Sequence, residues 1–347
     1  MGKHNRKLKP MIPGNHTQDK KVMSSLLDVM EDNHEFESLL NYNYTDLDIR
    51  SEIRRAIKEI ENIRNRPLIC YVSNVVRQNV KAPISINSED DLPFTELLST
   101  TTRSEKGIDI LLVTPGGSAQ QVDKFVNILR SKFDNITFIL PNVAMSAGSI
   151  FIMSGDNIIM SSTSYFGPID PQVPNKDGQF VPAQTLLALI SDIQERGETY
   201  IKKNLNPPWT DIQILKQIDP KDLGNALTAS QYSMDLTKRY LSQYKFKSWA
   251  KHSDGRDVSD QEKTDTALNI AKTLCDHKIW KTHGYGITRE IAESTLHLKI
   301  EHPEETEGLD RAIRRMWALL YWVFENTLIY KIFISDNYSL FKNEISS

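Results

Sequence analysis

The stretch that decides the fold is Ala144-Met145-Ser146-Ala147-Gly148-Ser149. It follows an apolar run typical of a buried strand and continues into residues typical of a helix. A serine among small residues at such a junction presents its hydroxyl to a substrate carbonyl and lets the substrate backbone approach closely. Small neighbours also leave backbone N–H groups free to point at a developing oxyanion. The stretch predicts Ser146 as a nucleophile; the alternative is a small residue packed at a tight turn.

Two further turns flank this stretch. Thr114-Pro115-Gly116-Gly117 lies upstream and adds a second source of backbone N–H donors, and Gly167-Pro168-Ile169-Asp170-Pro171 lies downstream. Strands alternate with helices over residues 67–165, which predicts a largely parallel sheet. In such sheets active sites form at the carboxyl ends of the strands. We therefore expect the glycine turn and the serine turn to meet at one edge of the sheet.

Hydrophobic periodicity gives the expected elements. Strands are predicted at residues 68–72, 108–113, 136–140 and 158–160, and helices at 46–65, 91–99, 118–133 and 149–153. Beyond residue 181 the pattern is helical, at 186–196, 210–217 and 227–244, and again over 264–334 after a polar linker at 246–263. We expect three parts: a basic, disordered or loosely ordered segment at 1–45, a catalytic domain at 46–245, and a helical region at 246–347.

Composition excludes several classes. The net charge of −3 lacks the basic excess of a general nucleic-acid binder. Two cysteines are too few for a disulfide scaffold and suit a reducing compartment. Cys275, His277 and His283 lack a second thiolate at metal-binding spacing, so no metal is expected. The N-terminal residues form no signal peptide, and the apolar run at 316–324 is far shorter than the ~20 residues of a membrane span. We expect a soluble cytoplasmic protein without a cofactor.

Together the three turns resemble the Clp-protease/crotonase superfamily, and within it the serine dehydrogenase proteinase family, which is related to signal peptide peptidase A. The resemblance covers residues 50–245 and, more loosely, extends to about residue 300 through Thr282-His283-Gly284-Tyr285-Gly286. It implies an α/β spiral of ββα units and a serine peptidase that uses Ser146 as nucleophile. The N–H groups of Gly117 and Ala147 would form the oxyanion hole. Gly116, Gly148 and Asp170 would contact substrate, and Asp170 could instead orient the base.

The general base does not follow from the resemblance. Clp-type proteases place a histidine in the strand after the serine, but no histidine occurs here between His34 and His252. The signal peptide peptidase group uses a lysine kept neutral by burial. The candidates left open are Lys176, Lys202, Lys203 and His283, from the same or a neighbouring subunit, each with the alternative of a surface or packing role.

Other functions and partners also stay open. The missing base favours a catalytically silent scaffold as the alternative, and acyl-CoA chemistry of the crotonase type is a third reading. Relatives assemble into rings or trimers, so we expect a homo-oligomer acting on peptide or protein substrates, with an unfoldase as a further partner. The apolar stripe Trp317, Leu320, Tyr321, Phe324 and Leu328 predicts an internal packing helix, an oligomer interface or a membrane-surface helix.

Overall fold

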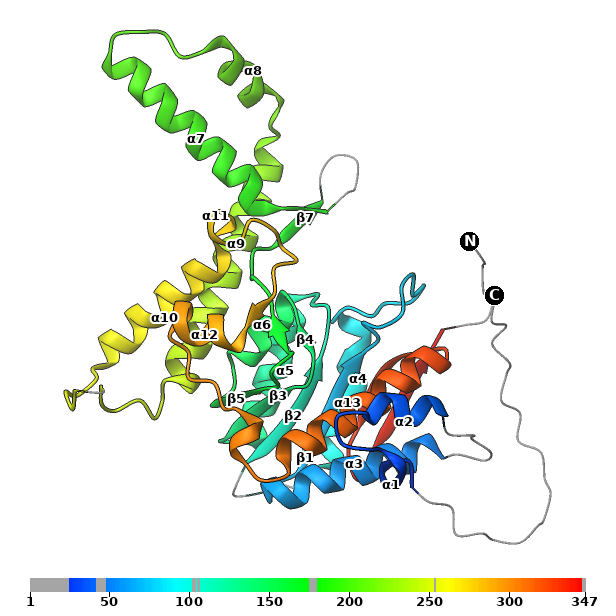
Figure 1. Ribbon diagram of the computed structural model, residues 1–347. Helices are drawn as coiled ribbons and strands as arrows, with labels where there is room; N and C mark the ends of the chain where they lie inside the picture. The colour runs from blue at the N-terminus through cyan, green and yellow to red at the C-terminus, as the bar shows by residue number, and fades with distance from the viewer. Residues whose placement is uncertain are drawn as a thin grey trace, which may run out of the picture.

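Figure 1 shows the computed structural model of the chain, which describes residues 25–41, 48–101, 104, 107–174, 180–252 and 254–344. Its centre is a six-stranded sheet in the order β11-β10-β1-β2-β3-β5. The strands β1 (Leu68–Ser73), β2 (Ile108–Val113), β3 (Ile136–Leu140) and β5 (Asn157–Met160) are parallel. This is the largely parallel α/β sheet predicted from the sequence, with the strand at 158–160 one residue longer.

The two strands beyond β1, at one edge of the sheet, were not predicted. Residues 264–334 were expected to be helical, but β10 (Ile329–Ile334) pairs antiparallel with β1, and β11 (Ser339–Asn343) pairs antiparallel with β10. The expectation is wrong here because β10 is buried on both faces and reads as a continuous apolar run, which periodicity cannot distinguish from a buried helix. The C-terminal region is thus part of the central sheet.

Alternation along β1 assigns the two faces of the sheet. Ile69 and Tyr71 belong to the core beneath α4 (Asp91–Thr100), α5 (Ala119–Lys132) and α6 (Ala147–Ile152). Leu68, Cys70 and Val72 belong to the core beneath α3 (Ile49–Arg64) and α13 (Leu309–Asn326). Successive strand residues point to opposite faces, so all six β1 residues are buried. The result is a three-layer helix–sheet–helix arrangement (Figure 1).

The apolar stripe near the C-terminus is an internal packing helix. Leu320 and Phe324 of α13 are fully buried against α3 and α2 (Glu35–Asn41). Tyr321 makes an edge-to-face contact with Phe36, at 4.9 Å between ring centroids. Leu328 lies beyond the helix and is 37% exposed. Of the three alternatives, internal packing is therefore the one that the structure confirms.

The N-terminal segment is more ordered than expected where the structure describes it. Residues 25–41 form α1 (Leu26–Val29) and α2, and Leu26 is fully buried. The Ser25 hydroxyl donates to the Glu52 carboxylate of α3 at 2.6 Å, which fixes this segment to the core. Residues 1–24 and 42–47 lie outside the described residues.

Further helices stand on the side of the sheet that carries α6. Two of them, α9 (Pro220–Tyr240) and α10 (Asp260–Cys275), pack against each other, and α11 (His277–Trp280) and α12 (Arg289–Leu296) follow. Before α9 in the chain, β7 (Gln172–Pro174), β8 (Phe180–Pro182), α7 (Ala183–Lys202) and α8 (Trp209–Gln217) lead outward. Figure 1 shows α7, α8 and the start of α9 projecting from the body, and we call residues 183–228 the arm.

Candidate active site

Ser146 occupies a sharp turn between β4 (Val143–Ala144) and α6. Its backbone has φ 51° and ψ −116°, a conformation that residues with a side chain rarely adopt. Holding such a residue costs about 1–3 kcal/mol and persists only where the surroundings enforce it. This strained strand-to-helix turn leaves the serine partly exposed. The serine was predicted at such a junction, and α6 begins at Ala147, the next residue.

The glycine turn packs directly onto the serine turn. Thr114 N–H donates to Val143 C=O at 2.9 Å, and Met145 N–H donates to Thr114 C=O at 3.0 Å. Gly116 has φ +102°, and a Cβ there would stand 2.8 Å from Ser146 Cβ. Only glycine allows the two turns to approach this closely. Gly116 is therefore a close-approach position beneath the serine, not a wall of the cavity as its predicted substrate contact would require.

A third segment completes the glycine turn. Ile86 N–H donates to Gly116 C=O at 2.7 Å, and Ser118 N–H donates to Ile86 C=O at 2.9 Å. Gly117 lies between these two bonds with φ +139°. Within the described part of the chain, the N–H groups of Gly117 and Ala147 donate no hydrogen bond. Two unpaired donors beside Ser146 are what an oxyanion hole requires.

Ser146, Gly117 and Ala147 open into one cavity of about 510 Å³. Its walls come from six parts of the chain: the segment before α4, the glycine turn with the start of α5, the serine turn with α6, the segment after β6, α9, and the segment before β9. The lining residues are Ser85, Pro115, Gly117, Ser118, Ala119, Gln120, Ser146, Ala147, Ile150, Ile169, Pro171, Gln172, Ala229, Tyr232, Ser233 and His283. This volume is within the range of ligand pockets in proteins.

His283 reaches this cavity and is held by Asp170. His283 Nδ1 lies 2.9 Å from Asp170 Oδ1. The Asp170 side chain is 2% exposed and that of His283 is 20% exposed. With Nδ1 as donor to the carboxylate, Nε2 is the acceptor nitrogen of the neutral imidazole. Asp170 thus contacts the histidine, and it does not line the cavity as a predicted substrate contact would.

A small second sheet brings His283 to the serine from far along the chain. β4 pairs with β6 (Tyr165–Phe166), and β6 pairs with β9 (Ile287–Thr288), which follows His283 by four residues. Ile169 N–H donates to Leu274 C=O at 3.0 Å, so the Asp170 loop is also fixed to α10. Ser146 therefore follows β4, Asp170 follows β6 and His283 precedes β9, three neighbouring strands of one sheet, although 137 residues separate Ser146 from His283 in number.

Ser149 and Gly148 support the turn from below. The Ser149 hydroxyl donates to Ala144 C=O at 2.9 Å and accepts from Gly167 N–H at 3.0 Å. A Cβ at Gly148 would stand 2.5 Å from Thr114 Cγ2. Gly148 is buried and allows α6 to pack against β2, so its place is structural and not at the predicted substrate contact.

The lysine candidates lie elsewhere. Lys202 ends α7 and Lys203 follows it; both are exposed, at the far end of the arm. α7 spans about 30 Å at 1.5 Å per residue, and only its first end is near the body. Neither lysine lines the cavity, which corrects the prediction of Lys202 as a catalytic residue. Lys176 lies outside the described residues.

Sequence reasoning missed the contributions of residues 85–86 and of α9. Ser85 lines the cavity, Ile86 holds the glycine turn, and Tyr232 and Ser233 form the wall opposite. Residues 75–90 show no strand or helix periodicity, so the sequence carried no signal for this placement. Nothing in the helical pattern of α9 indicated which turn would face the serine.

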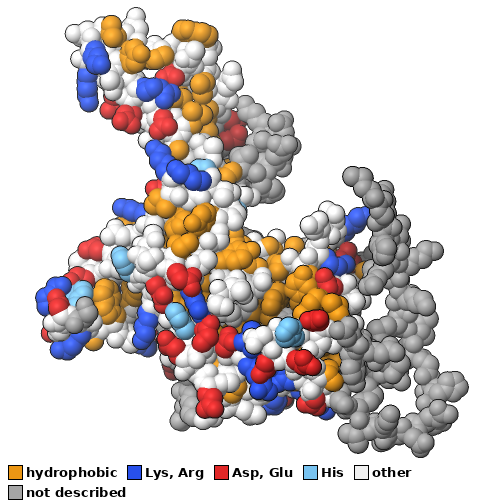
Figure 2. All heavy atoms as spheres, in the orientation of Figure 1, with side chains coloured by type: hydrophobic (Ala, Val, Ile, Leu, Met, Phe, Trp, Pro, Cys, Tyr) orange, Lys and Arg blue, Asp and Glu red, His pale blue; other side chains and the backbone are white. Residues whose placement is uncertain are grey.

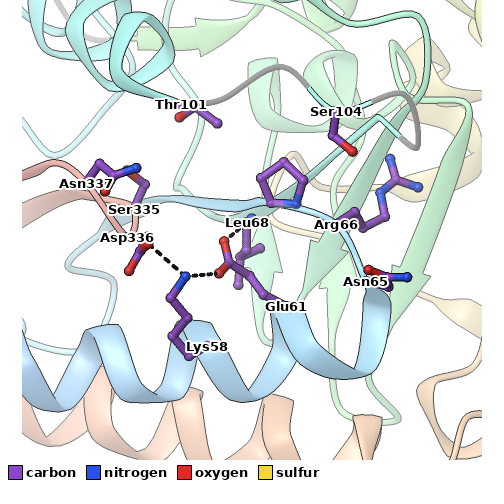
Figure 3. Close-up of a pocket in the computed structure, with 11 residues that line it drawn as sticks. Lys58, Glu61, Asn65, Arg66, Leu68, Thr101, Ser104, Ser335, Asp336 and Asn337 are labelled. Atoms are coloured by element: carbon purple, nitrogen blue, oxygen red, sulfur yellow. Dashed lines mark hydrogen bonds and ion pairs between the residues drawn. The ribbon is translucent and has the colours of Figure 1, made fainter.

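A second pocket lies at the opposite edge of the sheet, where β1 begins (Figure 3). Lys58 Nζ lies 3.0 Å from Glu61 and 2.7 Å from Asp336, and Glu61 accepts from Leu68 N–H at 2.9 Å. These bonds tie α3 to the start of β1 and to the β10–β11 turn. None of the residues that line this pocket lines the cavity of Ser146.

Neither a membrane helix nor a metal cluster is found where the chain is described. No helix among residues 25–41, 48–101, 104, 107–174, 180–252 and 254–344 is long and apolar enough to cross a membrane. Over the same residues, no group of three or more His, Cys, Asp or Glu side chains is arranged to hold a metal ion.

The largely parallel sheet between two helical layers makes this an α/β protein. The chain belongs to the family of ClpP-like SDH-type serine proteinases, whose family model matches residues 25–198, half of the chain. His283 and α9 to α13 lie outside that match. The family relationship supports a serine peptidase at the level of the family.

Two relatives come from Methanocaldococcus jannaschii. "Uncharacterized protein MJ1495" is 32% identical over 142 residues, which cover 38% of this chain and 44% of that protein. "Uncharacterized protein MJ0137" is 25% identical over 259 residues, covering 74% and 76%. A solved structure, a probable enoyl-CoA hydratase/isomerase from Mycobacterium abscessus, aligns at 13% identity and a TM-score of 0.23, covering 76% and 89%. A likeness that weak carries no argument about the site.

Proposed function

We propose that the chain is a serine peptidase in which Ser146, His283 and Asp170 act as a catalytic triad. The observation that carries the proposal is the partly buried hydrogen bond between His283 and Asp170, at the wall of the cavity that also contains Ser146. A nucleophile, a base and a carboxylate that orients the base are the parts of this mechanism, whatever their order in the chain.

In the first half-reaction His283 Nε2 takes the proton of the Ser146 hydroxyl as Oγ attacks the peptide carbonyl. The Gly117 and Ala147 N–H groups donate to the oxyanion of the tetrahedral intermediate; one such donor is worth about 2.7–4 kcal/mol. His283 then gives its proton to the leaving amine as the peptide C–N bond breaks. The second half-reaction repeats these steps with water, which releases the acid and restores Ser146.

Asp170 acts through His283 in this scheme. It accepts from Nδ1–H, which keeps Nε2 unprotonated, and it stabilises the imidazolium that forms. Burial makes the ion pair effective because little water screens it. The strained Ser146 backbone holds the hydroxyl in position at the head of α6.

Labelling with a fluorophosphonate tests this proposal. The wild-type chain should be labelled once, on Ser146, and Ser146→Ala should lose all labelling. His283→Ala should react at least about 100-fold more slowly, since general-base assistance contributes 10²–10⁴. A folded wild-type chain that the probe leaves unmodified would refute an activated serine and favour the silent scaffold.

A homo-oligomer with a cytoplasmic location is part of the proposal. The arm exposes large apolar side chains, with Trp209 at 74%, Ile201 at 63% and Leu205 at 54% (Figure 2). Clustered exposed apolar residues are typical of interaction surfaces. Cys70 and Cys275 are both buried and unpaired, which suits a reducing compartment. Light scattering should give a mass above that of one chain for the wild type, and Trp209→Asp should lower it.

A further inference from the structure

Lys331 of β10 is fully buried and donates three hydrogen bonds. Its Nζ lies 2.9 and 2.8 Å from the two oxygens of Asp90 and 2.9 Å from the backbone C=O of Ser85. A buried ammonium is tolerated only when it is paired and fully hydrogen-bonded. The ion pair with Asp90 satisfies this requirement, but the third bond reaches the wall of the cavity that holds Ser146.

The surroundings of Asp90 are rigid. Its carboxylate also accepts from the Tyr71 hydroxyl at 2.8 Å, from Asn87 N–H at 3.1 Å and from Lys342 Nζ at 3.1 Å. These partners come from β1, from the turn before Asp90 and from the β10–β11 hairpin. Lys331 is therefore held in one position, and its third donor has one fixed acceptor.

That acceptor begins a chain of two peptide groups that ends at Gly117. The Ser85 C=O and the Ile86 N–H belong to one planar peptide unit, and Ile86 N–H donates to Gly116 C=O at 2.7 Å. Gly116 C=O in turn shares a peptide unit with Gly117 N–H. In a trans peptide the C=O and N–H point in opposite directions, so Gly117 N–H points away from Ile86. Each hydrogen bond in such a series polarises the next.

We propose that Lys331 is a positioning residue for the oxyanion hole, which orients and polarises the Gly117 N–H through the Ser85–Ile86 and Gly116–Gly117 peptide units. The inference rests on the proposed serine peptidase. The lysine touches neither substrate nor Ser146, and it lies outside residues 25–198 that the family model covers. Its positive charge at one end of the series strengthens the donor at the other end.

Lys342 provides a matched control. It also bonds to Asp90, at 3.1 Å, and it donates to Glu89 C=O at 2.9 Å. Like Lys331 it lies on the β10–β11 hairpin, but it makes no bond to Ser85. Lys342→Met therefore removes a charge from the same carboxylate and leaves the peptide series intact.

The experiment compares Lys331→Met with Lys342→Met on a fluorogenic peptide. Loss of the bond to Ser85 should lower kcat about 10- to 100-fold and leave KM within about twofold of the wild type. This loss is smaller than the roughly 10²- to 10³-fold loss of kcat that follows when an oxyanion-hole donor is removed altogether. A peptide boronate, whose adduct carries the oxyanion, should lose affinity by the same factor. Lys342→Met should keep kcat within about threefold. Equal losses in both variants, a loss confined to KM, or an unchanged kcat in Lys331→Met would overturn the proposal.

Two additions keep the test decisive. If Lys331→Met does not fold, the charge-balanced variant Lys331→Met/Asp90→Asn replaces it and is compared with Lys342→Met, with the same expected difference. Amide hydrogen exchange over residues 115–119 needs no activity: it should be at least about tenfold faster in the Lys331 variant alone. If a fluorophosphonate leaves the wild type unlabelled, the proposed peptidase function fails, and the role of Lys331 is then tested by hydrogen exchange alone. An unchanged exchange rate over residues 115–119 in the Lys331 variant would show that Lys331 does not position the Gly117 N–H.

Discussion

Replacing Asp170 with asparagine tests the triad with the smallest change in shape. Asp170 Oδ1 faces His283 Nδ1, and Oδ2 is buried with no hydrogen-bond partner among the described residues. An asparagine can place its oxygen or its NH₂ toward the ring. With the oxygen there, the NH₂ takes the place of Oδ2 and two buried donors are left unpaired. With the NH₂ toward the ring, one of its two N–H groups donates to His283 Nδ1, which must then be unprotonated.

The second orientation is favoured by the cost of a buried unsatisfied donor, about 1–3 kcal/mol. It moves the ring proton to Nε2, which then cannot accept from Ser146. The tautomer alone therefore lowers the rate about 5- to 150-fold, and the lost stabilisation of the imidazolium adds to this. Together we expect kcat to fall about 10³- to 10⁴-fold, as in other triads.

The assay is kcat on a fluorogenic peptide, with the melting temperature as the check on folding. Asp211→Asn is the matched control, because that carboxylate is also buried and pairs with Arg196 in the arm. It should leave kcat within about twofold. A folded Asp170→Asn enzyme that keeps more than a tenth of the wild-type kcat would refute the role given to Asp170.

Three further predictions concern the turn, the core and pH. Gly117→Ala should lower kcat about 10²- to 10³-fold, because a Cβ would stand 2.3 Å from Ile86 C=O and displace the donor; Gly197→Ala, where a Cβ meets nothing within 4 Å, should not. Phe125→Ala should lower the free energy of unfolding in urea by about 3–5 kcal/mol, because Phe125 is fully buried and stacks on Phe94 at 4.1 Å, and a loss below 1 kcal/mol would contradict that packing. Burial lowers the pKa of Lys245 to about 8, so the unfolded chain binds more protons between about pH 8 and 10.5 and stability should rise with pH there. Relative to Lys245→Met, the wild type should gain up to about 3 kcal/mol between pH 7.5 and 10.5, and a flat difference would show that the amine is not desolvated.

The parallel core of the fold was predictable because each of its strands is a short apolar run between turn residues. β1, β2 and β3 were predicted within one residue of their bounds. β10 was not, because its apolar run directly continues the pattern of α13. The change from helix to strand at residue 327 depends on pairing with β1, a contact with a segment more than 250 residues earlier.

Every residue of the proposed site was a candidate from the sequence, but the choice among the candidate bases was not predictable, and the reason lies in sequence distance. Ser146 and Gly117 lie on turns whose small residues indicate that another backbone approaches closely. Both turns can be recognised from a few adjacent residues. His283 was one of four candidates for the base, and Asp170 was a candidate for the residue that orients it. The sequence did not show that the two pair, because their contact exists only through the pairing of β9 with β6. Lys331 is more remote still: an isolated lysine in an apolar strand gave no indication of a buried ion pair with Asp90.

In the proposed mechanism Ser146 and His283 act on one substrate carbonyl, and a peptidyl chloromethyl ketone probes both groups at once. The serine adds to the ketone and the adjacent methylene alkylates the nitrogen that faces it, so the reagent reports which base lies beside the serine. We expect peptide mapping to find a single adduct on His283 Nε2, absent from Ser146→Ala and from His283→Ala. An adduct on Lys202, Lys203 or another histidine, in a protein whose Ser146 reacts with a fluorophosphonate, would contradict the account.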